Sequence, residues 1–265
     1  MPRHEHLLLL DIGNTNTKIG LSRDGSLLEA FVFPTNPCDT ADSWGFRVLE
    51  ICRRLKLDPG ALSAWVVCSV VPPMDVQIRR ACHRYSGCPV LFVPSDLGVP
   101  LQNRYALPDE VGADRLVTAF AARSIFDTPS VVVVDFGTAT TLDCVQGNAY
   151  LGGLICPGVH TSAAGLGRLT AKLPHVGLEL EHPSLRIGES TATSLNNGFI
   201  FGFASMVQGL CRKLSQQLEN PVSVVATGGF AQIIQPVCPC LEHIRPDLLL
   251  SGLARIHQQG LDSPV

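Results

Sequence analysis

Two stretches of similar sequence, one in each half of the chain, constrain the fold most. Residues 7–21 read LLLLDIGNTNTKIGL and residues 131–145 read VVVVDFGTATTLDCV. Each has four aliphatic residues, then an aspartate, an apolar residue, a glycine, short and mostly polar residues, and a threonine. The aliphatic run predicts a strand buried on both faces, and the small polar residues predict a tight turn into a returning strand. We therefore expect two similar domains built on the same hairpin.

An aspartate follows the aliphatic run in both stretches, Asp11 in the first and Asp135 in the second. A carboxylate at the mouth of a buried strand suits Mg²⁺ bound to phosphate, because this cation takes oxygen ligands and keeps several waters. Backbone N–H groups of the turn and Lys18 can face phosphate oxygens. A plain hairpin with an Asx-turn also explains the first stretch alone. The repetition favours two phosphate loops that clamp one nucleotide between the domains.

The order of the remaining elements predicts a mixed α/β sheet in the first half. There we expect strands near 7–11, 18–21, 26–33, 64–71 and 90–93 and helices at 43–55 and 74–85, with Asp42 or Ser43 capping the first helix. In the second half we expect a hairpin at 131–145, a long helix at 192–218, a strand at 222–226 and a closing helix at 248–258. Residues 94–111, which contain three prolines, should form a loop. The crossing falls near residue 127, which predicts domains at 1–126 and 127–265.

Composition argues against two classes of function. The net charge of the 265 residues is −3 and no run of Lys or Arg occurs, which argues against nucleic-acid binding through a basic face. No apolar run is long enough for a membrane span, and only four leucines separate MPRHEH from Asp11, too few for a signal peptide. We therefore expect a cytoplasmic protein.

In a cytosolic chain most of the ten cysteines are expected to be small buried side chains. Cys238, Cys240 and His243 resemble a fragment of a zinc site, but no second pair of ligands completes it.

The segment GADR at residues 112–115 opens a predicted helix that runs to about Ile125. The helix dipole accounts for Asp114, since a carboxylate is favoured in the first turn. Arg115 gains nothing from the dipole at that end, so we expect an anionic ligand there, and the planar guanidinium fork suits a carboxylate.

A second feature, Thr227-Gly-Gly after a strand, would let a flat group such as adenine lie against the backbone.

The long helix of the second half predicts an oligomer. Phe199, Phe201 and Phe203 cannot all face one side of a helix, so burial on more than one face is expected. Only 16% of the residues are charged. We therefore expect a homodimer that uses residues 196–210. Ser190 or Thr191 is the expected cap of this helix.

Four motifs together resemble one family. They are DIGNTNTK at 11–18, GADR at 112–115, DFGTATT at 135–141 and GGLICPG at 152–158. The set resembles the type III pantothenate kinases of the acetate-kinase, sugar-kinase, Hsp70 and actin superfamily. The resemblance implies an α/β fold with two ribonuclease-H-like (actin-like ATPase) domains, whose mixed sheets are flanked by helices and which face each other across a nucleotide cleft.

Carried over position by position, the resemblance also implies roles for individual residues. The ATP phosphates and Mg²⁺ would be held by Asp11, Gly13, Asn14, Thr15, Asn16, Thr17, Lys18 and Thr138. Pantothenate would bind to Tyr105, Gly112, Ala113, Asp114, Arg115 and Thr191. Asp114 would accept the proton of the pantothenate hydroxyl, and Asp135 would bind an activating K⁺ or NH₄⁺ ion. Members of this family are usually homodimers.

The implied reaction transfers the γ-phosphate of ATP to pantothenate, the first step toward coenzyme A. Phosphoryl transfer relies on positioning and charge neutralisation, which fits a chain that offers loops, carboxylates and a lysine and has no obvious nucleophile. One alternative is another small-molecule kinase or phosphatase of the same superfamily, acting on a sugar or polyphosphate. Another is an ATP-binding accessory protein without catalysis, against which the presence of Asp11, Asp114 and Asp135 argues.

Overall fold

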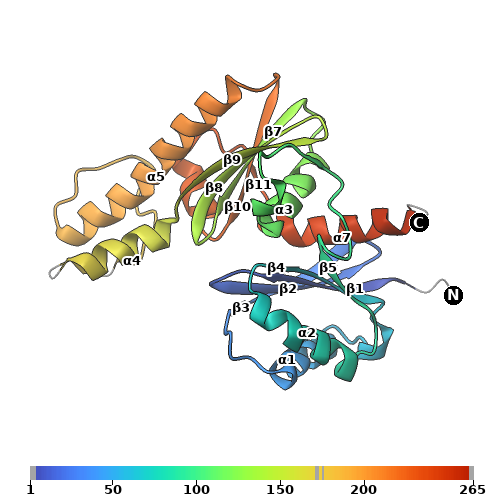
Figure 1. Cartoon of the computed structure of the whole chain (residues 1–265). Coiled ribbons are helices and arrows are strands. Elements are labelled where there is room, and N and C mark those ends of the chain that lie inside the picture. The colour runs from blue at the N-terminus through green and yellow to red at the C-terminus, as the bar shows by residue number, and fades with distance from the viewer. Residues whose placement is uncertain (1–3, 171–172, 175, 263–265) are drawn as a thin grey trace. The chain divides into compact units, whose positions relative to one another are not determined.

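The computed structural model describes residues 4–170, 173–174 and 176–262, which divide into two compact units (Figure 1). The N-terminal unit comprises Met1–Leu101, Asp109–Ala121 and Asp247–Val265, and the C-terminal unit comprises Gln102–Pro108 and Ala122–Pro246. The predicted division after residue 126 differs from these units because the last helix, α7 (Leu248–Asp262), belongs with the N-terminal unit. Among the described residues, no helix is both long and apolar enough to cross a membrane.

The N-terminal unit contains a five-stranded sheet in the order β3-β2-β1-β4-β5. Its strands are β1 (His6–Ile12), β2 (Asn16–Arg23), β3 (Ser26–Pro34), β4 (Ala64–Ser69) and β5 (Val90–Val93). The first three strands are antiparallel neighbours, whereas β4 runs parallel to β1 and β5 runs parallel to β4. The predicted mixed sheet is therefore confirmed.

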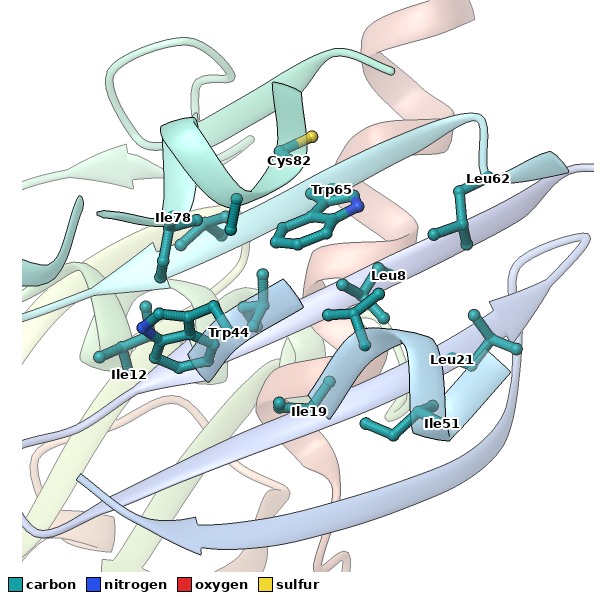
Figure 2. Close-up of a cluster of buried hydrophobic side chains, with 14 of the residues drawn as sticks. Leu8, Ile12, Ile19, Leu21, Trp44, Ile51, Leu62, Trp65, Ile78 and Cys82 are labelled. Carbon is teal, nitrogen blue, oxygen red and sulfur yellow. The ribbon is translucent and has the colours of Figure 1, made fainter. Parts of the chain in front are cut away.

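The leucine run of β1 is buried on both faces of this sheet, as predicted. Leu8 and Leu10 pack with Trp44 and Trp65 in one core, which α1 (Ala41–Arg54) and α2 (Pro72–Tyr85) cover (Figure 2). Leu7 and Leu9 pack in a second core with side chains of α3 (Ala113–Arg123) and α7. This second core explains why α7 returns to the N-terminal unit.

Two predicted helix starts are wrong. The cap of α1 is Thr40, whose hydroxyl accepts a hydrogen bond from the backbone N–H of Ser43, and neither Asp42 nor Ser43 is the cap. Asp42 instead accepts hydrogen bonds from Arg84 at 2.6 Å and from the Tyr85 hydroxyl at 2.7 Å. Helix α2 begins at Pro72, because proline needs no hydrogen-bond acceptor in a first turn.

The C-terminal unit repeats the arrangement in a six-stranded sheet of order β11-β10-β7-β8-β9-β6. Its strands are β6 (Gln102–Asn103), β7 (Ser130–Phe136), β8 (Ala139–Gln146), β9 (Ala149–Pro157), β10 (Val222–Gly228) and β11 (His243–Ile244). Strands β7, β8 and β9 are antiparallel and β10 runs parallel to β7, just as β4 runs parallel to β1. Each unit is thus built on the same hairpin, as the repeat predicts.

The predicted loop at 94–111 contains a short strand that sequence patterns do not reveal. Strand β6 adds a parallel edge to β9, with Gln102 beside Ala149 and Asn103 beside Tyr150. A single turn of 3-10 helix follows at Pro108–Glu110, and another, at Pro59–Ala61, precedes β4. Because β6 pairs with β9, residues 102–108 belong to the C-terminal unit.

Three helices complete the C-terminal unit: α4 (Val159–Leu169), the long α5 (Thr191–Ser215) and the short α6 (Ala231–Ile234). Phe199 and Phe203 of α5 pack against the core that contains Val132 and Val134 of β7. Ser190 is the cap of α5, and it exchanges hydrogen bonds with Thr193 in a capping box. Of the two residues predicted as the cap, the structure selects Ser190.

Candidate functional site

The turn between β1 and β2 is held by its own backbone and by a residue after β3. The Gly13 N–H donates to the Asn16 carbonyl at 3.1 Å, and Thr35 donates through its hydroxyl to the Gly13 carbonyl at 2.7 Å and through its N–H to the Thr15 carbonyl at 2.9 Å. These bonds leave the side chains of Asn14, Thr15 and Asn16 exposed. A preformed polar turn of this kind can receive an anion without first having to become ordered.

Thr17 has a different environment from the rest of the turn. Its side chain is buried, and its hydroxyl lies 2.9 Å from that of Thr35. The structure therefore gives Thr17 a role in holding the turn, and the phosphate contact that the resemblance implies stays a prediction. Thr35 was not identified from the sequence, because its contact with the turn depends on the pairing of β2 with β3.

Asp11 lies near the end of β1 between two strand neighbours. In register it is opposite Lys18 on β2 and beside Cys68 on β4. Asp11 and Lys18 are each partly exposed. A carboxylate and an ammonium group on opposite residues of an antiparallel pair lie within reach of one ligand. Asp11 and Lys18 can therefore both meet a phosphate group and its cation.

Asp114 is the second residue of α3, and its position depends on the glycine before the helix. Its Oδ1 accepts a hydrogen bond of 2.9 Å from the backbone N–H of Arg115. A Cβ added to Gly112 would lie 2.4 Å from this same oxygen. Because residue 112 is a glycine, the Asp114 carboxylate can take this orientation. Asp114 itself is half-buried.

The buried thiol of Cys68 responds to the charges of both Asp11 and Asp114. Burial raises the pKa of Cys68 well above its usual value, and the negative charges of Asp11 and Asp114 raise it further. Asp11 and Asp114 belong to the same unit, and both influence this thiol. Cys68 was not singled out from the sequence, since only the pairing of β1 with β4 places it beside Asp11.

In the C-terminal unit, Asp135 occupies the position on β7 that Asp11 has on β1. It lies opposite Thr141 on β8 and beside Thr227 on β10. Gly228 has a φ of 87°, and a Cβ added there would lie 2.5 Å from Asp135 Oδ1. The glycine pair that we linked to adenine therefore also makes room for the Asp135 carboxylate.

The second turn packs against the start of α4. The Gly137 N–H donates to the Ala139 carbonyl at 3.0 Å, and the Thr161 hydroxyl donates to the Thr138 carbonyl at 2.6 Å. A Cβ added to Gly158 would lie 2.3 Å from that carbonyl oxygen. Gly158 thus permits the close approach, and the side chain of Thr138 remains exposed.

Tyr105 and Thr191, the remaining predicted substrate residues, both belong to the C-terminal unit. The Tyr105 N–H donates to Asn103 Oδ1 at 3.0 Å, and its ring lies so near β9 that a Cβ added to Gly152 would be 3.0 Å from Cδ2. Gly152 has a φ of 111°, which also favours glycine. Thr191 is exposed, and because Ser190 is the helix cap, its hydroxyl has no capping role.

The predicted residues therefore form two groups, each within one unit. The N-terminal group comprises the turn at 11–18 and residues 112–115, and the C-terminal group comprises Tyr105, Asp135, Thr138 and Thr191. That the two groups face each other across one cleft stays a prediction.

Within the described residues, no group of three or more His, Cys, Asp or Glu side chains is arranged to hold a metal ion. Mg²⁺ bound to nucleotide phosphates needs no such cluster, since one or two carboxylates, the phosphates and water supply its ligands. His243, which the sequence places near two cysteines, packs its ring against Phe126 with 4.6 Å between the ring centroids.

Comparisons with known proteins agree with these motifs. Residues 7–213 match the family model described as type III pantothenate kinase. A type III pantothenate kinase of Nitratidesulfovibrio vulgaris (strain Miyazaki F) is 55% identical over 96% of this chain and 97% of its own length. One of Oleidesulfovibrio alaskensis is 52% identical with the same coverage.

Solved structures show that the fold is shared more widely. A ROK family glucokinase of Streptomyces griseus has a TM-score of 0.54 with 14% identity and covers 96% of this chain and 100% of its own. At that identity the likeness shows the fold alone, with two mixed sheets flanked by helices as in the actin-like sugar kinases. The family model and the two close relatives go further: this chain belongs to the type III pantothenate kinase family.

Proposed function

We propose that this chain carries out its family's reaction, the ATP-dependent phosphorylation of pantothenate in coenzyme A biosynthesis, with Asp114 as the base. The observation that supports these roles is that Asp11 and Asp114 belong to one unit and both raise the pKa of the buried Cys68 thiol. Asp11 lies just before the first turn, and Asp114 lies in the first turn of α3 beside Arg115. In the proposed reaction the acceptor hydroxyl and the phosphate that it attacks must meet at one point.

We assign the ATP phosphates to the two turns. The first turn contributes Asp11, Gly13, Asn14, Thr15, Asn16, Thr17 and Lys18, and Thr138 contributes from the second. Bound Mg²⁺ would neutralise charge on the phosphates, and the oxygen of Asp11 fits its preference for hard ligands. Lys18 lies opposite Asp11 and adds a positive charge for the phosphate oxygens. Positioning is the main task of such a site, because the transition state is loose.

Pantothenate is assigned to Tyr105, Gly112, Ala113, Asp114, Arg115 and Thr191. In this assignment Asp114 accepts the proton from the pantothenate hydroxyl as the oxygen attacks. The hydrogen bond from the Arg115 N–H fixes the orientation of the carboxylate before substrate binds. The Arg115 guanidinium suits the carboxylate of pantothenate.

We further propose that Asp135 binds the activating K⁺ or NH₄⁺ ion. Its strand neighbours are Thr141 and Thr227, and the absence of a side chain at Gly228 leaves room for its carboxylate. A carboxylate oxygen can bind a monovalent cation, whose charge would offset that of Asp135.

The proposed homodimer would form through α5. At Gly198, Gly202 and Gly209 an added Cβ would meet no atom within 4 Å, so part of the helix surface is open and lacks side chains. Close approach of a second helix is favoured by such small residues. Leu169 of the adjacent α4 is 87% exposed and would gain burial in the same contact.

The ten cysteines, all free thiols, suit a reducing compartment, so we propose the cytoplasm as the location.

A coupled ADP-release assay tests the assignment. With ATP, Mg²⁺ and K⁺ present, we expect release that requires pantothenate and does not occur when a hexose is added in its place. Release with hexose alone would favour a sugar kinase of the same fold. Absence of release with either acceptor, from folded protein that still binds ATP, would favour the accessory-protein alternative.

A further inference from the structure

Three thiols meet in the C-terminal unit, away from the residues assigned above. Cys211 lies on α5, and Cys238 and Cys240 follow the 3-10 turn at Gln235–Val237. The sulfurs of Cys238 and Cys240 are 3.5 Å apart, and Cys240 packs against the core cluster that contains Cys211. Nothing in the phosphoryl-transfer reaction requires a thiol here, so the cluster needs its own explanation.

The three thiols differ in accessibility. Cys211 and Cys238 are 1% and 0% exposed, whereas Cys240 is only partly buried. Cys240 and Cys211 line a pocket of about 390 Å³, together with Arg212. Cys238 is not among the residues of this pocket, and its thiol donates to the Ala204 carbonyl at 3.4 Å. A small reagent in the pocket can therefore reach Cys240, and Cys211 lines the same pocket.

The charge state of the cluster follows from these contacts. The neighbouring thiols of Cys211 and Cys238 lower the pKa of Cys240, because an S–H group that turns toward Cys240 stabilises its thiolate. The same contacts, with burial, raise the pKa of Cys211 and of Cys238. These shifts favour the thiolate at Cys240, the accessible sulfur, and the protonated form at Cys211 and Cys238. Only the thiolate form of cysteine is a good nucleophile.

We propose that Cys240 is an oxidation-sensitive thiol that reacts with a small hydroperoxide and is then captured by Cys211 as a disulfide. With hydrogen peroxide, the Cys240 sulfur attacks one oxygen, the O–O bond breaks, and the leaving hydroxide takes a proton to become water. The Cys211 sulfur then attacks the resulting sulfenic acid, the S–O bond breaks, and a second water leaves with the Cys211 proton. Two thiols are oxidised and one peroxide is reduced to two waters.

The disulfide would join α5 to the segment that follows β10 within the C-terminal unit. Cys211 is the partner that we choose because it shares the pocket with Cys240, whereas disulfide formation by Cys238 would cost its hydrogen bond to Ala204. Cys82 and Cys88 of the N-terminal unit form a second close pair, with 3.8 Å between their sulfurs, and serve as an internal comparison.

Alkylation and peptide mapping test the proposal on the full chain. At about pH 6, iodoacetamide should label Cys240 at least about 10-fold faster than the exposed Cys38, because only the thiolate reacts. After brief peroxide treatment, mapping should show a Cys211–Cys240 cross-link that dithiothreitol removes. Dimedone, which traps sulfenic acid, should label Cys240 in the C211S variant, and C240S should lose both products. C38S is the matched control and should form the same cross-link as the unmodified chain.

Three outcomes would overturn the proposal. They are equal labelling of Cys240 and Cys38, a cross-link confined to Cys82 and Cys88, and a Cys238–Cys240 disulfide in place of the expected pair. If C211S fails to fold, the alkylation rates and the cross-link map of the unmodified chain still decide between the proposal and these outcomes.

Discussion

Replacement of Gly112 by alanine tests how the position of the Asp114 carboxylate affects turnover. The added Cβ would lie 2.4 Å from Asp114 Oδ1, whereas ordinary contact begins at 3.4 Å, so the carboxylate must retreat by about 1 Å. Displacement of a catalytic group by about 1 Å can cost about 100-fold in rate. We therefore expect kcat of Gly112→Ala to fall by about 100-fold, which corresponds to about 2.7 kcal/mol of activation free energy.

The assay is steady-state ADP release with saturating ATP and pantothenate, alongside a thermal melt. The melting temperature should change little, because the clash involves one side chain that is partly exposed. Gly98→Ala is the matched control, since an added Cβ there meets no atom within 4 Å, and its kcat should equal that of the unmodified chain. A Gly112→Ala variant with kcat within about threefold of the control would refute the claim that this orientation of Asp114 matters for catalysis.

Three further predictions concern the cation, the assembly and the arrangement of the two units. Activity should require K⁺ or NH₄⁺, and Asp135→Asn should weaken that dependence; equal rates of the unmodified enzyme in sodium-only and potassium buffers would contradict the cation site. Light scattering at micromolar concentration should give the mass of a dimer, whereas a monomer would exclude the α5 interface. A crystal structure with a bound ATP analogue should show Asp11 and Asp135 on opposite sides of the nucleotide, and carboxylates on separate surfaces would disprove the paired-loop model.

The two hairpins could be predicted because their signals are local. Four aliphatic residues in β1 and four in β7 predict buried strands, and the glycine and short polar residues that follow predict the turns. The repeat also predicts that the two halves are built alike, and the strand orders of the two sheets confirm this similarity. Local patterns of this kind need no knowledge of distant contacts.

Features that depend on distant contacts could not be predicted in the same way. Strand β6 consists of two polar residues, Gln102 and Asn103, and exists because of its pairing with β9. Cys68 and Thr35 gain their positions beside the first turn only when strands pair. The start of α1 has three possible caps within four residues, and the contact of Asp42 with α2 leaves that role to Thr40.

The role of Asp114 as the base is tested by kcat of the Asp114→Asn variant. Asparagine is nearly isosteric and can still accept the hydrogen bond from Arg115, so pantothenate binding should change less than turnover. Loss of a general base predicts that kcat falls by about 10²- to 10⁴-fold, or about 3 to 5 kcal/mol of barrier. A role confined to the first turn of α3 would instead cost about 1 kcal/mol of stability and leave turnover nearly intact. We predict a folded variant with a near-normal melting temperature and a loss of kcat in that range; near-normal turnover would contradict the assignment of Asp114 as the base.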